Sequence, residues 1–402
     1  MSFVERLVCH PRLPLIAGLD SDRPVVRVWQ LEGDGLRELG GVGDDAAAYP
    51  PESWERHELT PSVAWHPHEP SLMVIGAAGL RRWTVDGVAE LPWLPACADH
   101  RDIAFSPDGR TLWVSPSSVA GEDKAWERSD VLDLATGTVE AGLWWDTGIV
   151  EHPGGGLLVT LSSEQGATDV LFARPDDAVP AGIRVYRHAI VLDVDGYHPP
   201  VFSSDGRYLA LRGNAYVQSL DVFEFPTLRK VLHTAFGDPY PGFPYPPEWL
   251  EEQALWSSHN IAFAPGAAVL LAGSPQGNVI EFDLEGERVS RRAVTGAAVS
   301  ALTVTPSGQL VVADRSGRVT VTGEPWEARS GDGAAARERV QEYLAGTAEL
   351  PGDADLETAL LRADGQRTWS ADDLETVTEA GDSDPTWLRL RAAMNTHDLG
   401  RE

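Results

Sequence analysis

The sequence predicts an all-β fold, a seven-bladed β-propeller of four-stranded antiparallel blades with a short α-helical C-terminal tail. Three observations lead to this prediction: a turn motif that recurs seven times, a second apolar strand after each copy, and a change to helical periodicity past about residue 329. We therefore expect a propeller over residues 1–328 and a helical extension over residues 329–402.

The recurring motif is a β-like residue, a small residue or histidine, usually a proline, and then a tight turn before an apolar strand. Successive copies lie 56, 40, 46, 51, 61 and 41 residues apart. The short spacings match the roughly 40–45 residues of a propeller blade, and the long ones indicate the same unit with inserted loops. The copies are anchored by Pro11, Pro67, Pro107, Pro153, Ser204, Pro265 and Pro306.

A second strand follows each motif a dozen or so residues later. Residues 25–29 and 278–284 are clear examples, because apolar side chains alternate or run together over these stretches as they do in half-buried strands. Four short antiparallel strands cannot cover their own apolar faces. Neighbouring blades would cover these faces, and closure of the ring would remove the exposed ends.

Two of the copies carry the residues of a known repeat. Phe282-Asp283 stands where WD40 repeats have Trp-Asp, and His259 stands where they have the histidine of Gly-His. The segment from His100 to Gly137 has the same outline, so residues 5–325 resemble a degenerate WD40-like propeller. Most blades lack the Trp-Asp pair, and Ser-Pro-Asp-Gly-Arg also occurs in TolB-like and lactonase-like propellers, which are the alternative.

Closure of the ring is the least determined part of the fold. The N-terminus is expected to supply the innermost strand of blade one, so no early residues remain to complete the outer edge of blade seven. Residues 324–327 form a poor strand. We hypothesise that a later segment, Gln366 to Trp369, fills this gap.

The tail has the composition of helices. Residues 334–344 are rich in helix formers, and residues 353–361 and 370–380 show the same pattern. A last helix would carry an apolar stripe of Trp387, Leu388, Leu390 and Met394. This stripe is expected either to pack against the side of the propeller or to be offered to a partner.

Charge restricts the class of partner. The formal net charge is −29, from 61 acidic and 32 basic residues. Nucleic-acid backbones and anionic membranes repel such a surface, so neither is expected as a partner. The charge permits a basic protein or peptide partner, or it serves solubility alone. All basic residues except Lys124 and Lys230 are arginines, which indicates a GC-rich and, we expect, actinobacterial source.

Several features favour a cytoplasmic location. Two cysteines, Cys9 and Cys97, are too few for a disulfide framework in a chain of this length. The first residues lack the pattern of a secretory signal, and no stretch approaches the about 18 apolar residues of a membrane span. A closed propeller leaves few free strand edges, so we expect a monomer in the absence of a partner.

Catalytic and metal-binding motifs are missing from the sequence. It contains no Gly-x-Ser-x-Gly, no phosphate-binding loop and no His-Glu-x-x-His. Asp193 to Gly196 lacks the distal glutamate of a calcium loop and predicts a β-turn, and His66 and His68 are expected to be ordinary loop histidines. We therefore expect no catalytic residue, no metal and no cofactor.

An enzyme with a site in the central channel is the first alternative. Propeller enzymes can gather their ligands from several blades, and such a site is invisible to local motifs. A hydrolase or lyase with a channel metal or small molecule would draw on residues at inner-strand starts, for which His100, His259 and Glu151 are the candidates.

Two inserted loops are the most informative features for function. Each contains Tyr-Pro-Pro-Glu followed closely by Trp, and each connects an outer strand to the next inner strand, so both are expected on the same face. Rigid aromatic rings in long loops are typical of a binding surface, although they could instead fold down and plug the face. The predicted partner-binding residues are Tyr49, Trp54, Tyr240, Phe243, Tyr245, Trp249 and Trp256.

These patterns favour a non-enzymatic scaffold that binds a protein or peptide through the loop-bearing face. The second alternative, beside the channel enzyme, is a regulatory or sensory subunit of a bacterial signalling or defence complex.

Overall fold

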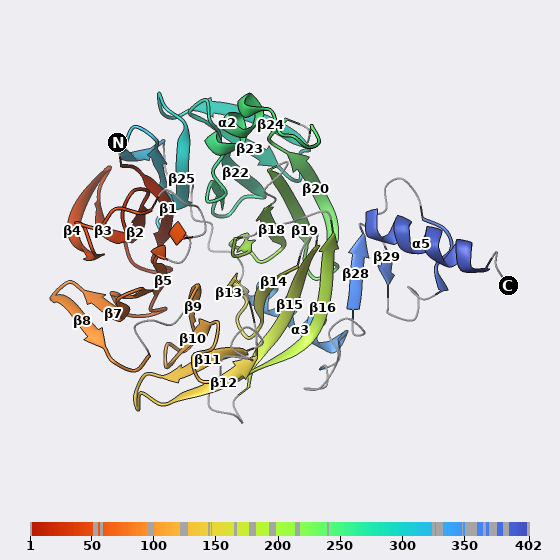
Figure 1. The fold of residues 1–402 in the computed structure, drawn as a ribbon, viewed down its shortest axis with the longest axis horizontal. Helices are drawn as coiled ribbons and strands as arrows, with labels where there is room; N and C mark the ends of the chain where they lie inside the picture. Colours follow the sequence, from red (N-terminus) through yellow and green to blue (C-terminus); the bar gives the residue numbers. More distant parts are fainter. Residues whose placement is uncertain are drawn as a thin grey trace.

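The computed structural model shows a ring of seven blades around a central axis (Figure 1). The predicted all-β, seven-bladed propeller is thereby confirmed. The structure describes residues 2–50, 55–56, 59–94, 100–120, 128–143, 145, 147–164, 167–176, 182–192, 198–213, 218–238, 241–323, 326, 333–347, 349, 360–364, 367–369, 376–380 and 386–399.

The first four blades each contain four consecutive antiparallel strands that run from the axis outward. Blade one is β1 (Val4–Cys9), β2 (Leu15–Asp20), β3 (Val25–Glu32) and β4 (Gly35–Gly43). Blade two is β5 (Ser62–Trp65), β6 (Ser71–Gly76), β7 (Gly79–Thr84) and β8 (Gly87–Leu91). Blade three is β9 (Asp102–Phe105), β10 (Thr111–Ser115), β11 (Arg128–Asp133) and β12 (Val139–Leu143). Blade four is β13 (Thr147–Glu151), β14 (Leu158–Glu164), β15 (Ala167–Asp176) and β16 (Gly182–Leu192).

Blades five and six repeat this order, whereas blade seven has three strands among the residues that the structure describes. Blade five is β17 (Val201–Phe202), β18 (Tyr208–Gly213), β19 (Ser219–Glu224) and β20 (Arg229–Ala235). Blade six is β21 (Ile261–Phe263), β22 (Val269–Gly273), β23 (Asn278–Asp283) and β24 (Arg288–Ala293). Blade seven is β25 (Val299–Val304), β26 (Leu310–Asp314) and β27 (Val319–Thr322).

The tail segment that we assigned to blade seven extends blade four instead. β28 (Leu360–Asp364) lies parallel to β16, with His188 opposite Leu360, and β29 (Arg367–Trp369) pairs with β28 (Figure 1). The hypothesis was therefore wrong for 367–369, and Gln366 lies outside the described residues. β16 offers a long outer edge of backbone groups that require partners, and β28 satisfies part of it.

The ring closes by packing of blade one against blade seven. The Ser300 hydroxyl donates a hydrogen bond to the Val4 carbonyl at 2.6 Å, and the Gln309 amide donates to the Gly33 carbonyl at 2.9 Å. Ile16 of blade one and Val311 of blade seven share one buried apolar cluster. The same arrangement recurs around the ring, where each interface between neighbouring blades holds its own cluster of buried side chains.

Histidines of the recurring turn motif contact the next blade of the ring. His152 sits at the end of β13, and its Nδ1 accepts a hydrogen bond from the Gly154 backbone N–H at 3.0 Å. Its Nε2–H donates to the Gly206 carbonyl of blade five at 2.9 Å. His10 makes the same pair of contacts, to its own turn and to the Glu69 carbonyl of blade two. Both bonds require a neutral ring with its proton on Nε2.

The same position of the motif differs in other blades, in its residue or in its contacts. His66 of blade two caps its own turn, and its ring lies against Gly109, where a Cβ atom would come within 2.4 Å of Nε2. Gly109 also has a φ of +75°, which favours glycine. In blades three and five a serine replaces the histidine, since the hydroxyls of Ser106 and Ser203 accept the backbone N–H of the following strand. His66 thus has a structural role in the turn.

Among the residues that the structure describes, three helices accompany the strands: α2 (Pro247–Leu255), α3 (Gly333–Ala345) and α5 (Thr386–Leu399). α3 confirms the helix expected at 334–344, and it buries Val340 and Tyr343 against blades four and five. No helix among the described residues is long and apolar enough to cross a membrane.

The rest of the tail differs from the expected helices. Residues 353–359 and 370–375 lie outside the described part, 360–361 begin β28, and 377–380 are not helical. On α5, Leu390 and Met394 are 59% and 57% exposed, so these two side chains do not pack against the propeller. The side chains of Trp387 and Leu388 lie outside the described part of the chain.

Candidate functional site

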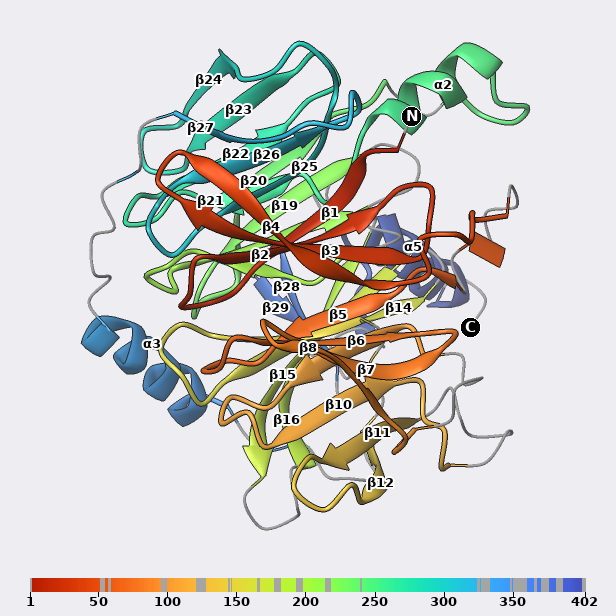
Figure 2. The same cartoon turned by 90° about the vertical axis from the view of Figure 1, so that its left-hand side faces the viewer.

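The two aromatic loops open on the same face of the ring, as expected from their topology. Figure 2 shows α2 and the short segment before β5 on one side, with α3 on the opposite side. Hydrogen bonds between the loops and the turns of that face support this placement. Arg56 of the first loop donates to the Ser21 carbonyl at 3.1 Å, and Arg315 donates to the Ala254 carbonyl of α2. We call this side the loop-bearing face.

Tyr49, in the first loop, is held down on the propeller. Its backbone N–H donates to the Asp22 carbonyl at 2.9 Å, and the Arg56 guanidinium lies 5.0 Å from the ring centroid. Burial raises the pKa of Tyr49 to about 12. Trp54 of the same loop lies outside the described residues. The described part of this loop thus acts as a support rather than as an open surface.

The second loop builds an aromatic stack from its support outward. Trp249 of α2 is 8% exposed, and its indole N–H donates to the Asp238 carbonyl at 3.3 Å. Tyr245 stacks on Trp249 with centroids 5.5 Å apart, and Phe243 packs edge-on against Tyr245 at 5.8 Å. Phe243 is 84% exposed, so the outermost ring of the stack faces solvent.

The loop returns to blade six through a second stack. The Trp256 ring lies 5.0 Å from Phe236, and the Arg212 guanidinium lies 5.1 Å from the Phe236 centroid. Arg212 is only 2% exposed, and burial lowers its pKa to about 9. Its hydrogen bonds go to neutral oxygens, including Asn260 Oδ1 at 3.1 Å and the Ser257 carbonyl at 3.2 Å.

Arg212 therefore ties blade five to the base of the second loop, and it was not among the predicted residues. The available signal was a charged residue in an otherwise apolar strand, since β18 reads Tyr-Leu-Ala-Leu-Arg-Gly and is buried throughout. A buried arginine needs several acceptors, and a loop that returns over the strand is one source of them.

α2 also exposes apolar side chains that the aromatic pattern did not indicate. Leu250 is 48% exposed and Leu255 is 41% exposed. We call the exposed residues of this loop and helix, Phe243, Leu250 and Leu255, the α2 surface. The helix also carries Glu248, exposed, in its first turn, with Glu251 and Glu252 in the next. The α2 surface thus combines apolar contact area with negative charge.

The predicted partner-binding residues that the structure describes divide into three groups by exposure. Phe243 is exposed, Tyr49, Tyr245 and Trp256 are half-buried, and Trp249 is buried as a support. Tyr240 lies outside the described residues, as does Trp54. The structure brings Phe243, Tyr245 and Trp249 together in one stack. Some of these rings fold down onto the propeller, whereas the outermost ring is exposed to solvent.

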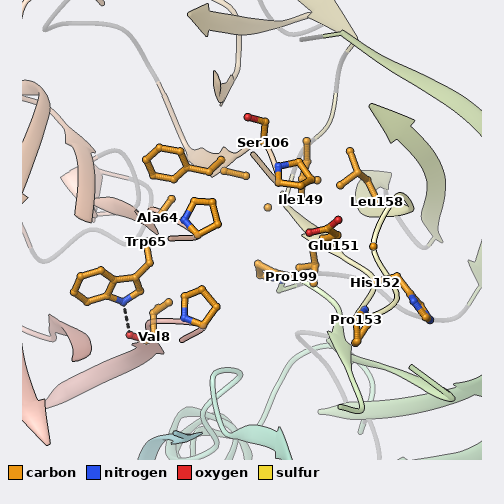
Figure 3. Close-up of a pocket in the computed structure, with 18 of the residues that line it drawn as sticks. Val8, Ala64, Trp65, Ser106, Ile149, Glu151, His152, Pro153, Leu158 and Pro199 are labelled. Carbon is orange, nitrogen blue, oxygen red and sulfur yellow. Dashed lines mark hydrogen bonds between the residues drawn. The ribbon is translucent and has the colours of Figure 1, made fainter. Parts of the chain in front are cut away.

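The central channel holds a cavity of about 750 Å³ that reaches the side opposite the loop-bearing face, where α3 begins (Figure 3). Inner strands of blades one to four line it, together with their turn prolines, such as Pro67 and Pro153, and the start of α3. Glu151 points into this space, and its partial removal from solvent raises the pKa of its carboxyl group. The indole N–H of Trp65 donates to the Val8 carbonyl at 2.8 Å in the cavity wall.

The candidates for a channel enzyme do not share one site. Glu151 is the last residue of β13, not the start of an inner strand as we expected, whereas His100 and His259 precede β9 and β21. His259 instead meets His198, with ring centroids 4.0 Å apart, and burial lowers its pKa well below the usual value. Within the described ranges, no group of three or more His, Cys, Asp or Glu residues could hold a metal ion. Residues 193–196 lie outside those ranges.

Comparison with known proteins adds no family assignment: no family model matches the chain, and no curated protein matches it significantly.

Proposed function

We propose that the chain is a non-enzymatic interaction scaffold that binds a protein or peptide through its loop-bearing face. The observation that carries this proposal is the α2 surface, where Phe243, Leu250 and Leu255 are exposed on a rigid support. A preorganised apolar surface loses little conformational entropy on binding, and aromatic residues commonly dominate the energy of such contacts.

The rigidity of the support strengthens the argument. Phe243 rests on Tyr245, which rests on the buried Trp249, and the far end of the loop rests on Phe236 above Arg212. A loop that served only to cover the propeller would direct its outermost ring inward. Here that ring is 84% exposed.

The partner is proposed to be a basic segment with apolar side chains. α2 carries three glutamates beside Leu250 and Leu255 in the sequence, and the whole chain carries a net charge of −29. Complementary charge would speed association and select against acidic partners. We propose further that the chain is a bacterial, cytoplasmic protein of WD40-like ancestry that is monomeric in the absence of its partner.

Affinity capture with matched variants tests the proposal. Phe243→Ser/Leu250→Ser removes two apolar side chains of the α2 surface, and Val85→Ser/Val289→Ser removes two that are 63% and 61% exposed elsewhere. The tagged wild-type chain should retain a protein from lysate of the source cell. The control variant should retain the same protein, and the α2 variant should lose it. Direct titration of that purified protein should reproduce the difference. Equal retention by both variants would refute the α2 surface as the binding site.

A further inference from the structure

The cavity on the α3 side gathers three arginines in an otherwise acidic protein. Three arginines line it: Arg6 from β1, Arg12 from the β1–β2 turn, and Arg337 from α3. They come from separate segments of the chain and meet at one cavity. The net charge of the whole chain is −29, so a group of three arginines contrasts with the overall acidic character of the protein.

None of these three arginines forms an ion pair with a carboxylate in the described part of the chain. Among the described residues, eleven other arginines make ion pairs with carboxylates. An arginine retains its charge at all physiological pH values, so the cavity keeps cationic groups available.

Two carboxylates, Asp102 and Glu151, also line the cavity, so three arginines against two acids leave a formal charge of +1. Asp102 is engaged in joining three blades, because it accepts hydrogen bonds from Ser62 Oγ at 2.9 Å, from its neighbour Ile103 N–H at 2.8 Å, and from the Gly148 N–H. Glu151 is therefore the one lining carboxylate, in the described part of the cavity, that is free of interblade bonds, and its Oε1 accepts from the Gly156 N–H at 3.1 Å.

We propose that this cavity is a binding site for a small polyanion, a metabolite that carries phosphate or carboxylate groups. The volume of about 750 Å³ is that of a small-molecule site. Guanidinium groups recognise carboxylates and phosphates through paired N–H donors, and a concave wall of low dielectric strengthens that attraction. Arg12 and Arg337 are exposed, whereas Arg6 is half-buried on β1.

The site is independent of the proposed scaffold function. It lies toward α3, whereas the α2 surface lies on the loop-bearing face (Figure 2). Loss of partner binding in an α2 variant and loss of anion binding in a cavity variant can therefore be measured separately, and failure of one proposal leaves the other standing.

Titration calorimetry of the full chain with two probes, pyrophosphate and citrate, at constant ionic strength tests the proposal. Arg12→Gln/Arg337→Gln removes two cavity charges from exposed positions. Arg82→Gln/Arg291→Gln is the matched control, because it removes the same charge from exposed residues of β7 and β24. Circular dichroism and thermal unfolding of each variant confirm that the fold is retained.

We expect one saturable site per chain for at least one probe. The cavity variant should weaken binding by about tenfold or more, and the control by less than about twofold. Glu151→Gln keeps the bond to Gly156 but removes the negative charge, so it should tighten binding severalfold. Preference for pyrophosphate would identify a phosphate ligand, and preference for citrate a carboxylate ligand.

Any one of three results would overturn the proposal. The first is that neither probe binds saturably to the wild type at millimolar concentration. The second is that the cavity variant binds as well as the wild type. The third is that both double variants weaken binding equally, which would show a general response to net charge rather than a site.

Discussion

Protonation of His152 is expected to break the contact between blades four and five. The ring is 1% exposed and accepts the Gly154 N–H on Nδ1 while it donates from Nε2 to the Gly206 carbonyl. A second proton on Nδ1 would remove that acceptor and place a charge between the rings of Phe202 and Phe225. The folded protein therefore holds the neutral form.

The size of the effect follows from proton linkage. Burial, as the largest cause, lowers the pKa of His152 from 6.5 to about 4. Because the folded state resists protonation, this stability is fully present above pH 6.5 and is lost as the pH falls toward 4. Between pH 7.5 and pH 5, His152 alone should reduce the free energy of unfolding by about 2 kcal/mol.

Urea unfolding at the two pH values measures this contribution. Glutamine does not titrate. The decrease in the free energy of unfolding between pH 7.5 and pH 5 should therefore be about 2 kcal/mol smaller for His152→Gln than for the wild type. His68→Gln, at an exposed turn position, is the control and should behave as the wild type does. An equal pH dependence in wild type and His152→Gln would refute the role given to this histidine.

Three other perturbations test the fold and the site support. Arg212→Met should lower the free energy of unfolding, measured in urea, by about 3–5 kcal/mol, because it leaves buried acceptors such as Asn260 unsatisfied. The same variant should be cleaved faster by proteases within residues 236–256. Gly109→Ala should lower the unfolding free energy by about 2 kcal/mol, since its Cβ would meet the His66 ring at a φ of +75°. Removal of residues 348–402 takes away β28 and frees the edge of β16, so light scattering should reveal self-association; an unchanged monomer would contradict this role of the tail.

The repeat pattern was sufficient to predict the ring because each blade is a local unit. A motif such as Phe105-Ser106-Pro107 and the strand after it are neighbours in sequence, so their pairing follows from turn chemistry and apolar periodicity. The interblade contacts were not predictable in the same way. His152 and Gly206 are 54 residues apart, and nothing in either local segment indicates the other.

The tail shows the limit of local patterns most clearly. Leu360 has helix-forming neighbours, yet it lies in a strand because the exposed edge of β16, about 170 residues earlier in the chain, accepts it. Tertiary contact there overrides propensity. Blade seven, in contrast, closes on blade one through Ser300 and Gln309, so ring closure does not depend on that strand.

The candidate site was predictable in place but not in detail. The Tyr-Pro-Pro-Glu repeat predicted two loops on one face, and Figure 2 agrees. Tyr49 and Tyr245 occupy the same position of that repeat, yet one lies beneath Arg56 and the other supports an exposed phenylalanine. Which aromatic ring is exposed depends on the residues that each loop contacts in the folded protein. The local sequence of the loop does not indicate those contacts.

Hydrogen exchange of the chain in complex with its captured protein tests the central claim most directly. Binding through the α2 surface predicts slowed exchange at backbone amides of 241–256, with blade-edge strands such as β24 unchanged. The Phe243→Ser/Leu250→Ser variant should lose that protection. Protection confined to another face, with 241–256 exchanging as in the free protein, would contradict the assignment of the loop-bearing face as the binding site.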